Sequence, residues 1–242
     1  MSRHLLVTGG SRGIGAEIVR GAVAAGDRVT FTYRDRADAA AALVAELGPA
    51  VRALQGDAAT LEAEAVVADA VDALGPLDVL VNNAGVTGPL GRFADLGDDE
   101  LRRIFEVNVF GVLRLSRAAV AHWRTTGRPG VVVNVGSIAA ATGAPGEYIA
   151  YAGSKAALEA ITRGLGRELA PEGIRVVAIV PGTTDTEIHA TAGDPDRPAR
   201  VATRVPLGRV ARPSEIADAV LWAASERASY VTATSVTVAG GL

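Results

Sequence analysis

The sequence predicts a single α/β domain over residues 1–242, built on a doubly wound parallel sheet of about seven strands. Short runs of apolar and β-branched residues alternate with amphipathic segments, and this alternation is typical of a parallel sheet with helices on both faces. A glycine-rich turn joins the first run to the first helical pattern. A chain of 242 residues without repeats or a low-complexity linker is commonly one domain.

The expected strands are short and spread along the whole chain. They lie near residues 5–8, 28–33, 50–55, 77–82, 130–136, 174–180 and 234–238. Two stretches, 86–98 and 182–198, contain several Gly and Pro residues and read as irregular. We expect the second to be a lid, since loops of that length in compact domains are often functional.

The first strand runs directly into the glycine-rich turn Gly9–Gly15, and a helical pattern follows through about Ala25. Glycines let the backbone turn tightly and approach a pyrophosphate, which then sits on the N-terminus of the helix. The spacing is TGxxxGxG rather than GxGxxG. The turn therefore predicts a phosphate-binding loop.

Two later strands end in small or polar residues. The strand near 77–82 leads into Asn83-Ala84-Gly85, and the strand near 130–136 leads into Ser137. Ligands of open α/β sheets bind at the carboxyl ends of the strands. We therefore expect these residues to line one crevice, where Ser137 can donate a hydrogen bond to a substrate carbonyl.

Lys155 is the only lysine in a chain with 24 basic residues. A site that requires a compact ammonium would resist the broad planar guanidinium of arginine. Tyr151 precedes Lys155 by one helical turn, so both side chains lie on the same helix face. A free tyrosine has a pKa of about 10, and a neighbouring cation lowers it. The pair therefore predicts a proton donor that works near neutral pH.

These pieces, in this order, resemble the short-chain dehydrogenase/reductase family over essentially the whole chain. The resemblance implies a Rossmann-type fold and a catalytic triad of Ser137, Tyr151 and Lys155. Asn108 is implied as the fourth member, which holds a water that links the lysine to a proton relay. Lys155 is also expected to bind the nicotinamide ribose.

The resemblance also implies a nicotinamide dinucleotide cofactor. It assigns the pyrophosphate to Thr8, Gly9, Gly10, Ser11, Arg12, Gly13, Ile14 and Gly15. It assigns the adenine to Asp57, with Ala58 beside it, and the adenosine ribose and central sheet to Asn83, Ala84 and Gly85. Around the nicotinamide it places Tyr151, Lys155, Pro181, Gly182, Thr184 and Thr186.

The end of the second strand bears on the choice of cofactor. NAD binding usually needs a carboxylate on the ribose 2′-hydroxyl, whereas a 2′-phosphate needs cations. In the family's pattern the acidic position falls on Tyr33, Arg34 follows it, and Arg12 lies on the same side. These residues favour NADP(H). Asp35 keeps NAD open, because it lies about 20 residues after the loop, where an acid is expected.

The activity that the resemblance implies is the reduction of a ketone by NADPH. The 3-oxoacyl carrier-protein reductases are the nearest group by overall pattern, on the segments 206–209 and 213–215. Arg128 matches one arginine that docks the acidic carrier protein in those enzymes, but Glu172 stands at the position of the other and would repel such a partner. A free cyclic, quinone-like or polyketide-derived ketone therefore stays open, as does a non-catalytic nicotinamide-binding sensor.

Several other residues have less defined roles. Tyr148 is expected at the start of a helix, in the wall of the substrate pocket, rather than as the acid. His189 lies in the expected lid, either as polar surface or in contact with the substrate. Trp123 and Trp222 are expected in packing or subunit contacts. No chemistry is assigned to His4 or His122.

Composition excludes several classes of function. The net charge is −3 and no basic tract occurs, so nucleic-acid binding is not expected. With zero cysteines, neither a disulfide nor a thiolate metal site is possible, and no metal is expected. No apolar run is long enough for a membrane span, and the first strand begins too early for a signal peptide. We expect a cytoplasmic protein that forms a homotetramer, or less favourably a dimer, through apolar faces near 99–126 and 149–170.

Overall fold

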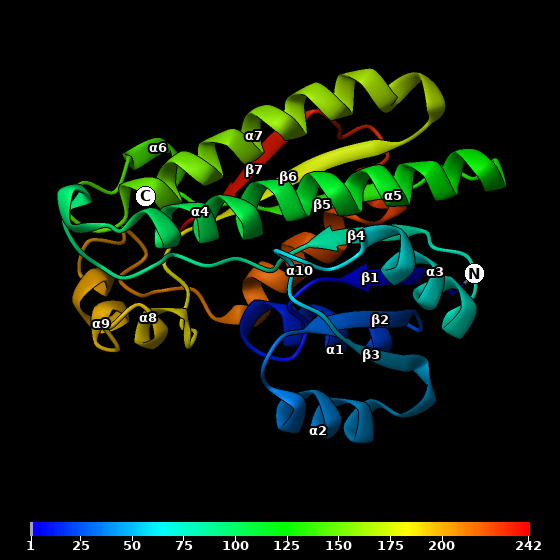
Figure 1. The fold of residues 1–242 in the computed structure, drawn as a ribbon, viewed down its shortest axis with the longest axis horizontal. Coiled ribbons are helices and arrows are strands. Elements are labelled where there is room, and N and C mark those ends of the chain that lie inside the picture. The colour runs from blue at the N-terminus through cyan, green and yellow to red at the C-terminus, as the bar shows by residue number, and fades with distance from the viewer. Residues whose placement is uncertain (1) are drawn as a thin grey trace.

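Short apolar runs form one parallel sheet in the computed structural model, which describes residues 2–242 (Figure 1). Within these residues the sheet has seven strands in the order β3-β2-β1-β4-β5-β6-β7, and every neighbouring pair is parallel. The strands are β1 (His4–Val7), β2 (Arg28–Tyr33), β3 (Val51–Gln55), β4 (Val79–Asn82), β5 (Val131–Val135), β6 (Arg175–Pro181) and β7 (Thr234–Val238). The predicted doubly wound parallel sheet is confirmed, with strand ends that differ from the expected ones by at most two residues.

Helices cover both faces of this sheet (Figure 1). The longer ones are α1 (Gly13–Ala24), α2 (Ala37–Leu47), α3 (Ala63–Leu74), α4 (Asp98–Phe105), α5 (Gly111–Thr126), α7 (Ile149–Leu169) and α10 (Pro213–Ala223). The shorter ones are α6 (Ala139–Thr142), α8 (Ile188–Thr191), α9 (Arg197–Ala202), the π-helical turn η3 (Glu106–Phe110) and the 3₁₀ turns η1 (Gly48–Ala50), η2 (Phe93–Asp95), η4 (Ala170–Glu172) and η5 (Glu226–Ala228).

The alternation of side chains along each strand separates two hydrophobic cores. Leu5 and Val7 of β1 point into the core that α1, α2 and α10 cover, whereas Leu6 points into the core that α3, α5 and α7 cover. Both cores are buried because the central strands β1, β4, β5 and β6 are largely apolar on both faces, as expected in a parallel sheet. Trp123 of α5 lies in the second core, where its Nε1 donates to the main-chain oxygen of Leu77 at 2.8 Å. Trp123 is therefore a packing residue of this core, as one of the two expected roles proposed.

The order of the strands reverses beside β1. This strand pairs with β2 on one side and with β4 on the other, so the helices that follow β1 and β4 leave the sheet in opposite directions. A crevice forms at the carboxyl ends of the strands at such a point, and it is the usual ligand site of this architecture. The glycine-rich turn follows β1 and therefore lies at the crevice.

The stretch expected to be an irregular lid is partly helical. Residues 183–202, here called the lid segment, contain α8 and α9, which lie beside each other at the end of the molecule away from the N-terminus (Figure 1). The prediction of irregular structure over 182–198 was wrong for α8 and for the first two residues of α9. The other irregular stretch, 86–98, contains only the 3₁₀ turn η2 before α4 begins.

Residues 2–242 contain neither a membrane-spanning helix nor a cluster of potential metal ligands. None of the helices there is long and apolar enough to cross a membrane. No group of three or more His, Asp or Glu side chains in this part of the chain is placed to hold a metal ion.

Candidate active site

One large cavity lies at the carboxyl ends of the strands, with a volume of about 710 Å³. That size is within the usual range for small-molecule sites. The predicted site residues come together here from nearly the whole length of the chain. Most of them line the cavity; Thr8, Gly10 and Asn108 do not, and Asn108 lies behind its wall.

The glycine-rich turn forms a backbone cradle at one side of this cavity. Gly9 and Gly13 have φ angles of +66° and +53°, which side chains rarely permit. A Cβ atom on Gly15 would lie 2.2 Å from the main-chain oxygen of Gly9, so only glycine fits there. Helix α1 begins at Gly13 without a side-chain cap, which leaves its first N–H groups to face an anion. The turn therefore fits the pyrophosphate of a dinucleotide.

Asn83 holds this turn against the end of β4. Its Nδ2 donates to the main-chain oxygens of Thr8 and Gly9, at 2.9 and 3.1 Å. The main-chain nitrogens of Asn83 and Ala84 both donate to Oγ1 of Thr8 at 3.0 Å. The Asn83 amide group therefore donates to the protein backbone, and these hydrogen bonds fix the shape of the glycine-rich turn.

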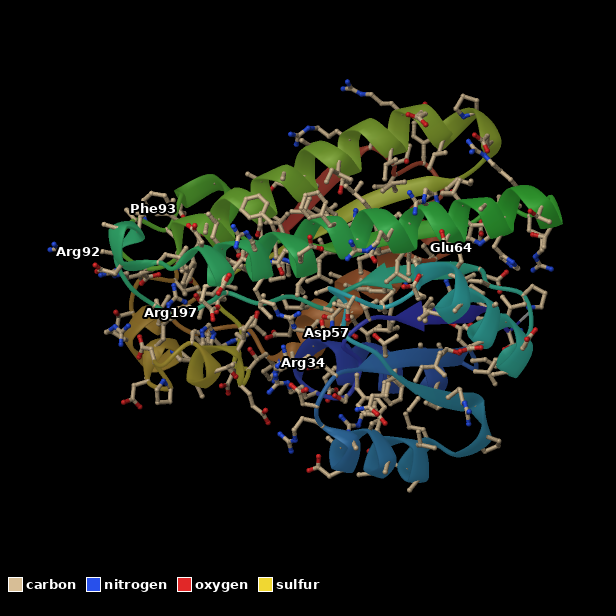
Figure 2. All side chains as sticks on the ribbon, viewed as in Figure 1. Arg34, Asp57, Glu64, Arg92, Phe93 and Arg197 are labelled. Atoms are coloured by element: carbon tan, nitrogen blue, oxygen red, sulfur yellow. The ribbon has the colours of Figure 1, made fainter. Side chains whose placement is uncertain are left out.

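The far end of the cavity is rich in charge. Arg34 follows β2 and Asp57 follows β3, and Figure 2 shows the two close to each other. Burial raises the pKa of Asp57, but the ion pair with Arg103 at 2.8 Å, the hydrogen bond from the main-chain nitrogen of Ala59 and the charge of Arg34 together hold the pKa below its usual value. Arg34 forms an ion pair with the adjacent Asp35.

Tyr151 and Lys155 lie at the floor of the cavity, on one face of α7. Their side chains are buried, and the Lys155 Nζ lies 5.7 Å from the centre of the Tyr151 ring. Nζ donates to the main-chain oxygen of Val135, the last residue of β5, at 2.8 Å. Ser137 lies two residues beyond the end of β5 and shares a hydrogen bond with the Tyr151 side chain. Strand β5 and helix α7 therefore bring these three groups together.

Burial determines the titration of this pair. The expectation of a lowered pKa for Tyr151 was wrong, because the net shift is upward. Burial raises the pKa of Tyr151, and the hydrogen bond with Ser137 and the charge of Arg197 only partly oppose this. Burial also lowers the pKa of Lys155 to about 8. In both cases the cause is the loss of water around the charged form.

Asn108 lies in the π-helical turn η3 between α4 and α5 and is fully buried. Its Oδ1 accepts from the main-chain nitrogen of Val86 at 2.9 Å, and its Nδ2 donates to the oxygen of Val86 at 2.8 Å. Nδ2 also donates to Oγ of Ser154 at 3.0 Å. Both hydrogens of the amide are therefore engaged, which leaves one lone pair of Oδ1 for a further partner.

The lid segment lines a further side of the cavity. Arg197 of α9 is nine-tenths buried, and its Nη2 lies 2.7 Å from a carboxylate oxygen of Glu147. Its guanidinium also lies over the ring of Tyr148, 5.2 Å from the ring centre. The Tyr148 ring meets Tyr151 edge-on at 5.3 Å. Tyr148 is the residue before α7, at the expected start of the helix. It also lines the cavity.

Comparison with known proteins identifies the family. A family model described as enoyl-(acyl carrier protein) reductase matches residues 9–242, and solved structures of short-chain dehydrogenases/reductases superpose on 99% of the chain. The chain belongs to the short-chain dehydrogenase/reductase family.

Three relatives illustrate the range of this family. A 3β-hydroxysteroid dehydrogenase 1 of Eggerthella lenta is 37% identical over 99% of this chain and 93% of its own. A 3-ketoacyl-(acyl-carrier-protein) reductase of Brucella melitensis, solved with NADH, is 30% identical with a TM-score of 0.92, over 99% of this chain and 97% of its own. A blue fluorescent protein from a metagenomic library, solved with NADPH, is 35% identical with a TM-score of 0.89, over the same shares.

The residues considered for carrier-protein docking lie away from the site of this short-chain dehydrogenase/reductase. Arg128 comes before β5 and is therefore at the opposite edge of the sheet from the cavity, where it pairs with Asp78 at 2.8 Å. Glu172 pairs with Arg124 of α5 at 2.6 Å. Both charges are therefore paired within the chain itself.

Sequence reasoning missed several residues around this site. Ser154 lies inside the Tyr151–Lys155 segment, and its buried hydroxyl donates to the main-chain oxygen of Tyr151 at 2.7 Å. A buried serine next to the lysine was a signal that could have been followed. Arg197 and Arg103 carry no such signal, because their partners are distant in sequence.

His189 is half-buried in the cavity wall, where its Nε2 lies 2.9 Å from the oxygen of Thr184.

Proposed function

We propose that this protein is an NADPH-dependent ketoreductase that reduces a carbonyl group to a secondary alcohol. One observation carries the proposal: the cavity that contains the glycine cradle also holds Ser137, Tyr151 and Lys155 at its floor. A dinucleotide on the cradle and a carbonyl at Tyr151 therefore share one enclosed space. The nicotinamide, when bound, supplies the hydride.

Tyr151 is the proton donor in this reaction. Its raised pKa keeps the phenol protonated around neutral pH, so it is ready to protonate the developing alkoxide. Ser137 donates a hydrogen bond to the same oxygen and holds the carbonyl in place. The Lys155 ammonium, one helical turn away, stabilises the phenolate that remains after the proton has left. Asn108 acts through the backbone of Val86 and through Ser154, as a positioning residue.

NADPH is favoured because cations surround the outer end of the cavity. Arg12, Arg34 and Arg36 all line it, together with Tyr33 at the position where NAD-dependent members carry an acid. A 2′-phosphate gains charge-assisted hydrogen bonds from arginines. Asp35 is paired with Arg34, so its carboxylate is engaged in this structure.

The first candidate substrate is a 3-oxoacyl thioester. Two observations support it: the overall sequence pattern of the chain, and the 3-ketoacyl-(acyl-carrier-protein) reductase among its structural relatives. The second candidate is a free cyclic, quinone-like or polyketide-derived ketone. The ion pair between Arg128 and Asp78, at the edge of the sheet opposite the cavity, favours this second candidate because it removes a docking charge. The related 3β-hydroxysteroid dehydrogenase is consistent with it. The proposal also includes a cytoplasmic location and a homotetrameric assembly.

A panel of carbonyl compounds tests this function. NADPH oxidation is followed by absorbance with a 3-oxoacyl carrier-protein thioester, its coenzyme A analogue, and mono- and polycyclic ketones or quinones. Turnover of at least one class, lost in Tyr151→Phe, is the expected result. Binding of NADPH without turnover of any compound would instead identify a nicotinamide-binding sensor.

A further inference from the structure

The cofactor end of the cavity contains one carboxylate that comes from the lid segment. Glu187, the residue before α8, places its Oε2 2.8 Å from Nη1 of Arg12 and 3.5 Å from Nη1 of Arg36. Arg12 belongs to the glycine-rich turn and Arg36 precedes α2. All three side chains line the cavity. Glu187 therefore joins the lid segment to two cations on the cofactor side.

These two arginines belong to the positive cluster that is available to a phosphate on the adenosine ribose. Arg34, the third member, is already paired with Asp35 of its own loop. Arg36 has a second partner of its own in Asp38, at 3.1 Å. For Arg12 the ion pair with Glu187 is the one that the structure contains. A dianion that approaches Arg12 therefore competes with the Glu187 carboxylate for its guanidinium.

We propose that Glu187 is a specificity-determining residue for the cofactor, which competes with the 2′-phosphate of NADP(H) for Arg12 and Arg36. This inference rests on the proposed function only in that it takes the cavity to bind a nicotinamide dinucleotide. NADH lacks the 2′-phosphate and leaves the Glu187 ion pairs in place. The lid segment thus lowers the preference for NADPH that the arginines alone would give.

The strength of this competition is limited by solvent. The side chains of Arg12 and Glu187 are 44% and 58% exposed, and an ion pair in such a position contributes about 0.2 to 1 kcal/mol. Removal of the carboxylate should therefore tighten NADPH binding by a factor of about 1.4 to 5. The gain should shrink at high ionic strength, because salt screens exposed charges.

The test is a Glu187→Gln variant of the full chain, with Glu46→Gln as the matched control. Glu46 forms an exposed ion pair with Arg20 at 2.7 Å, outside the cavity, so its substitution makes the same change in net charge. Dissociation constants are measured by calorimetry for NADPH and NADH, and for 2′,5′-ADP and 5′-AMP as probes of the adenosine end alone. No turnover is required.

Selective tightening of NADPH and 2′,5′-ADP in Glu187→Gln, with NADH and 5′-AMP unchanged and with Glu46→Gln like the wild type, is the expected result. Equal tightening of all four ligands, weaker binding of all four, or no change would overturn the proposal. Failure of the proposed NADPH preference gives a different pattern. If the wild type binds NADH more tightly but Glu187→Gln still gains affinity for NADPH alone, the role of Glu187 stands and only the preference was wrong.

Discussion

Asn108 donates a hydrogen bond from Nδ2 to the Oγ atom of Ser154, at 3.0 Å. The same Oγ donates to the main-chain oxygen of Tyr151 at 2.7 Å, so the π-helical turn is linked to the helix that carries the acid. Ser154→Ala would leave a buried amide hydrogen of Asn108 without a partner, which costs about 1 to 3 kcal/mol. We expect a melting temperature several degrees lower and a several-fold fall in kcat, with KM for the cofactor unchanged.

A matched control separates the two effects of this substitution. Ser116 is also a buried serine that accepts from an asparagine amide, Asn82, at 3.2 Å, but it does not line the cavity. Ser116→Ala should lower the melting temperature without lowering kcat. An equal fall of kcat in both variants would show that Ser154 acts only through stability.

The two tyrosines of the cavity should differ in their effects. Tyr151→Phe removes the proton donor and should lower kcat by about 10² to 10⁴-fold. Tyr148→Phe keeps the ring under Arg197 and the edge-on contact with Tyr151, so the chemical step should be retained. Single-turnover kinetics on both variants measure this step. Loss of the step in Tyr148→Phe, with Tyr151→Phe active, would reverse the assignment of the acid.

Lys155 should make the stability of the protein depend on pH. Burial lowers its pKa from 10.5 to about 8, so between these values the unfolded chain binds the proton and the native state does not. The free energy of unfolding should therefore rise with pH in this window through this group. Urea titrations of the wild type and Lys155→Met check it: the wild type should gain stability relative to the variant from about pH 8 to 10. A constant difference over this range would contradict the low pKa.

Cofactor preference should respond to Arg34. Replacement by Gln removes a charge-assisted hydrogen bond to the 2′-phosphate, worth about 1.5 to 3 kcal/mol, which corresponds to about a tenfold or greater loss of affinity. NADPH should weaken and NADH should change little, and Tyr33→Asp in that background should shift preference toward NADH. Catalytic efficiencies with both cofactors measure this. An unmodified enzyme that prefers NADH would indicate that Asp35 binds the ribose.

Assembly is expected through the faces near η3, α5 and α7. Phe110, Leu113 and Ile149 are 46%, 37% and 43% exposed there, an arrangement that favours contact with a second copy. We expect a homotetramer in light scattering, and a smaller species for Leu113→Glu. A monomer at micromolar concentration would contradict the expectation.

The fold and the meeting of the site residues in one cavity could be predicted from local features. Strands such as Val131–Val135 are short apolar runs, and Tyr151 and Lys155 share a helix face through their spacing alone. The charges that surround the site could not be predicted in this way. Glu187 meets Arg12 across 175 positions of the chain, and that contact depends on how the lid segment packs. The raised pKa of Tyr151 was also missed, because burial is a property of the folded molecule.

The π-helical turn Glu106–Phe110 has a further consequence for the design of variants. A π turn holds one more residue than an α-helical turn, so it offsets the faces of α4 and α5 and aims Asn108 at Val86 and Ser154. Deletion of one residue here would restore a regular helix and rotate Asn108 by about 100°, the angle per residue of an α-helix. A variant with a regular helix here would therefore lose the hydrogen bonds of Asn108 to Val86 and Ser154, so the π turn should be kept in any stabilised design.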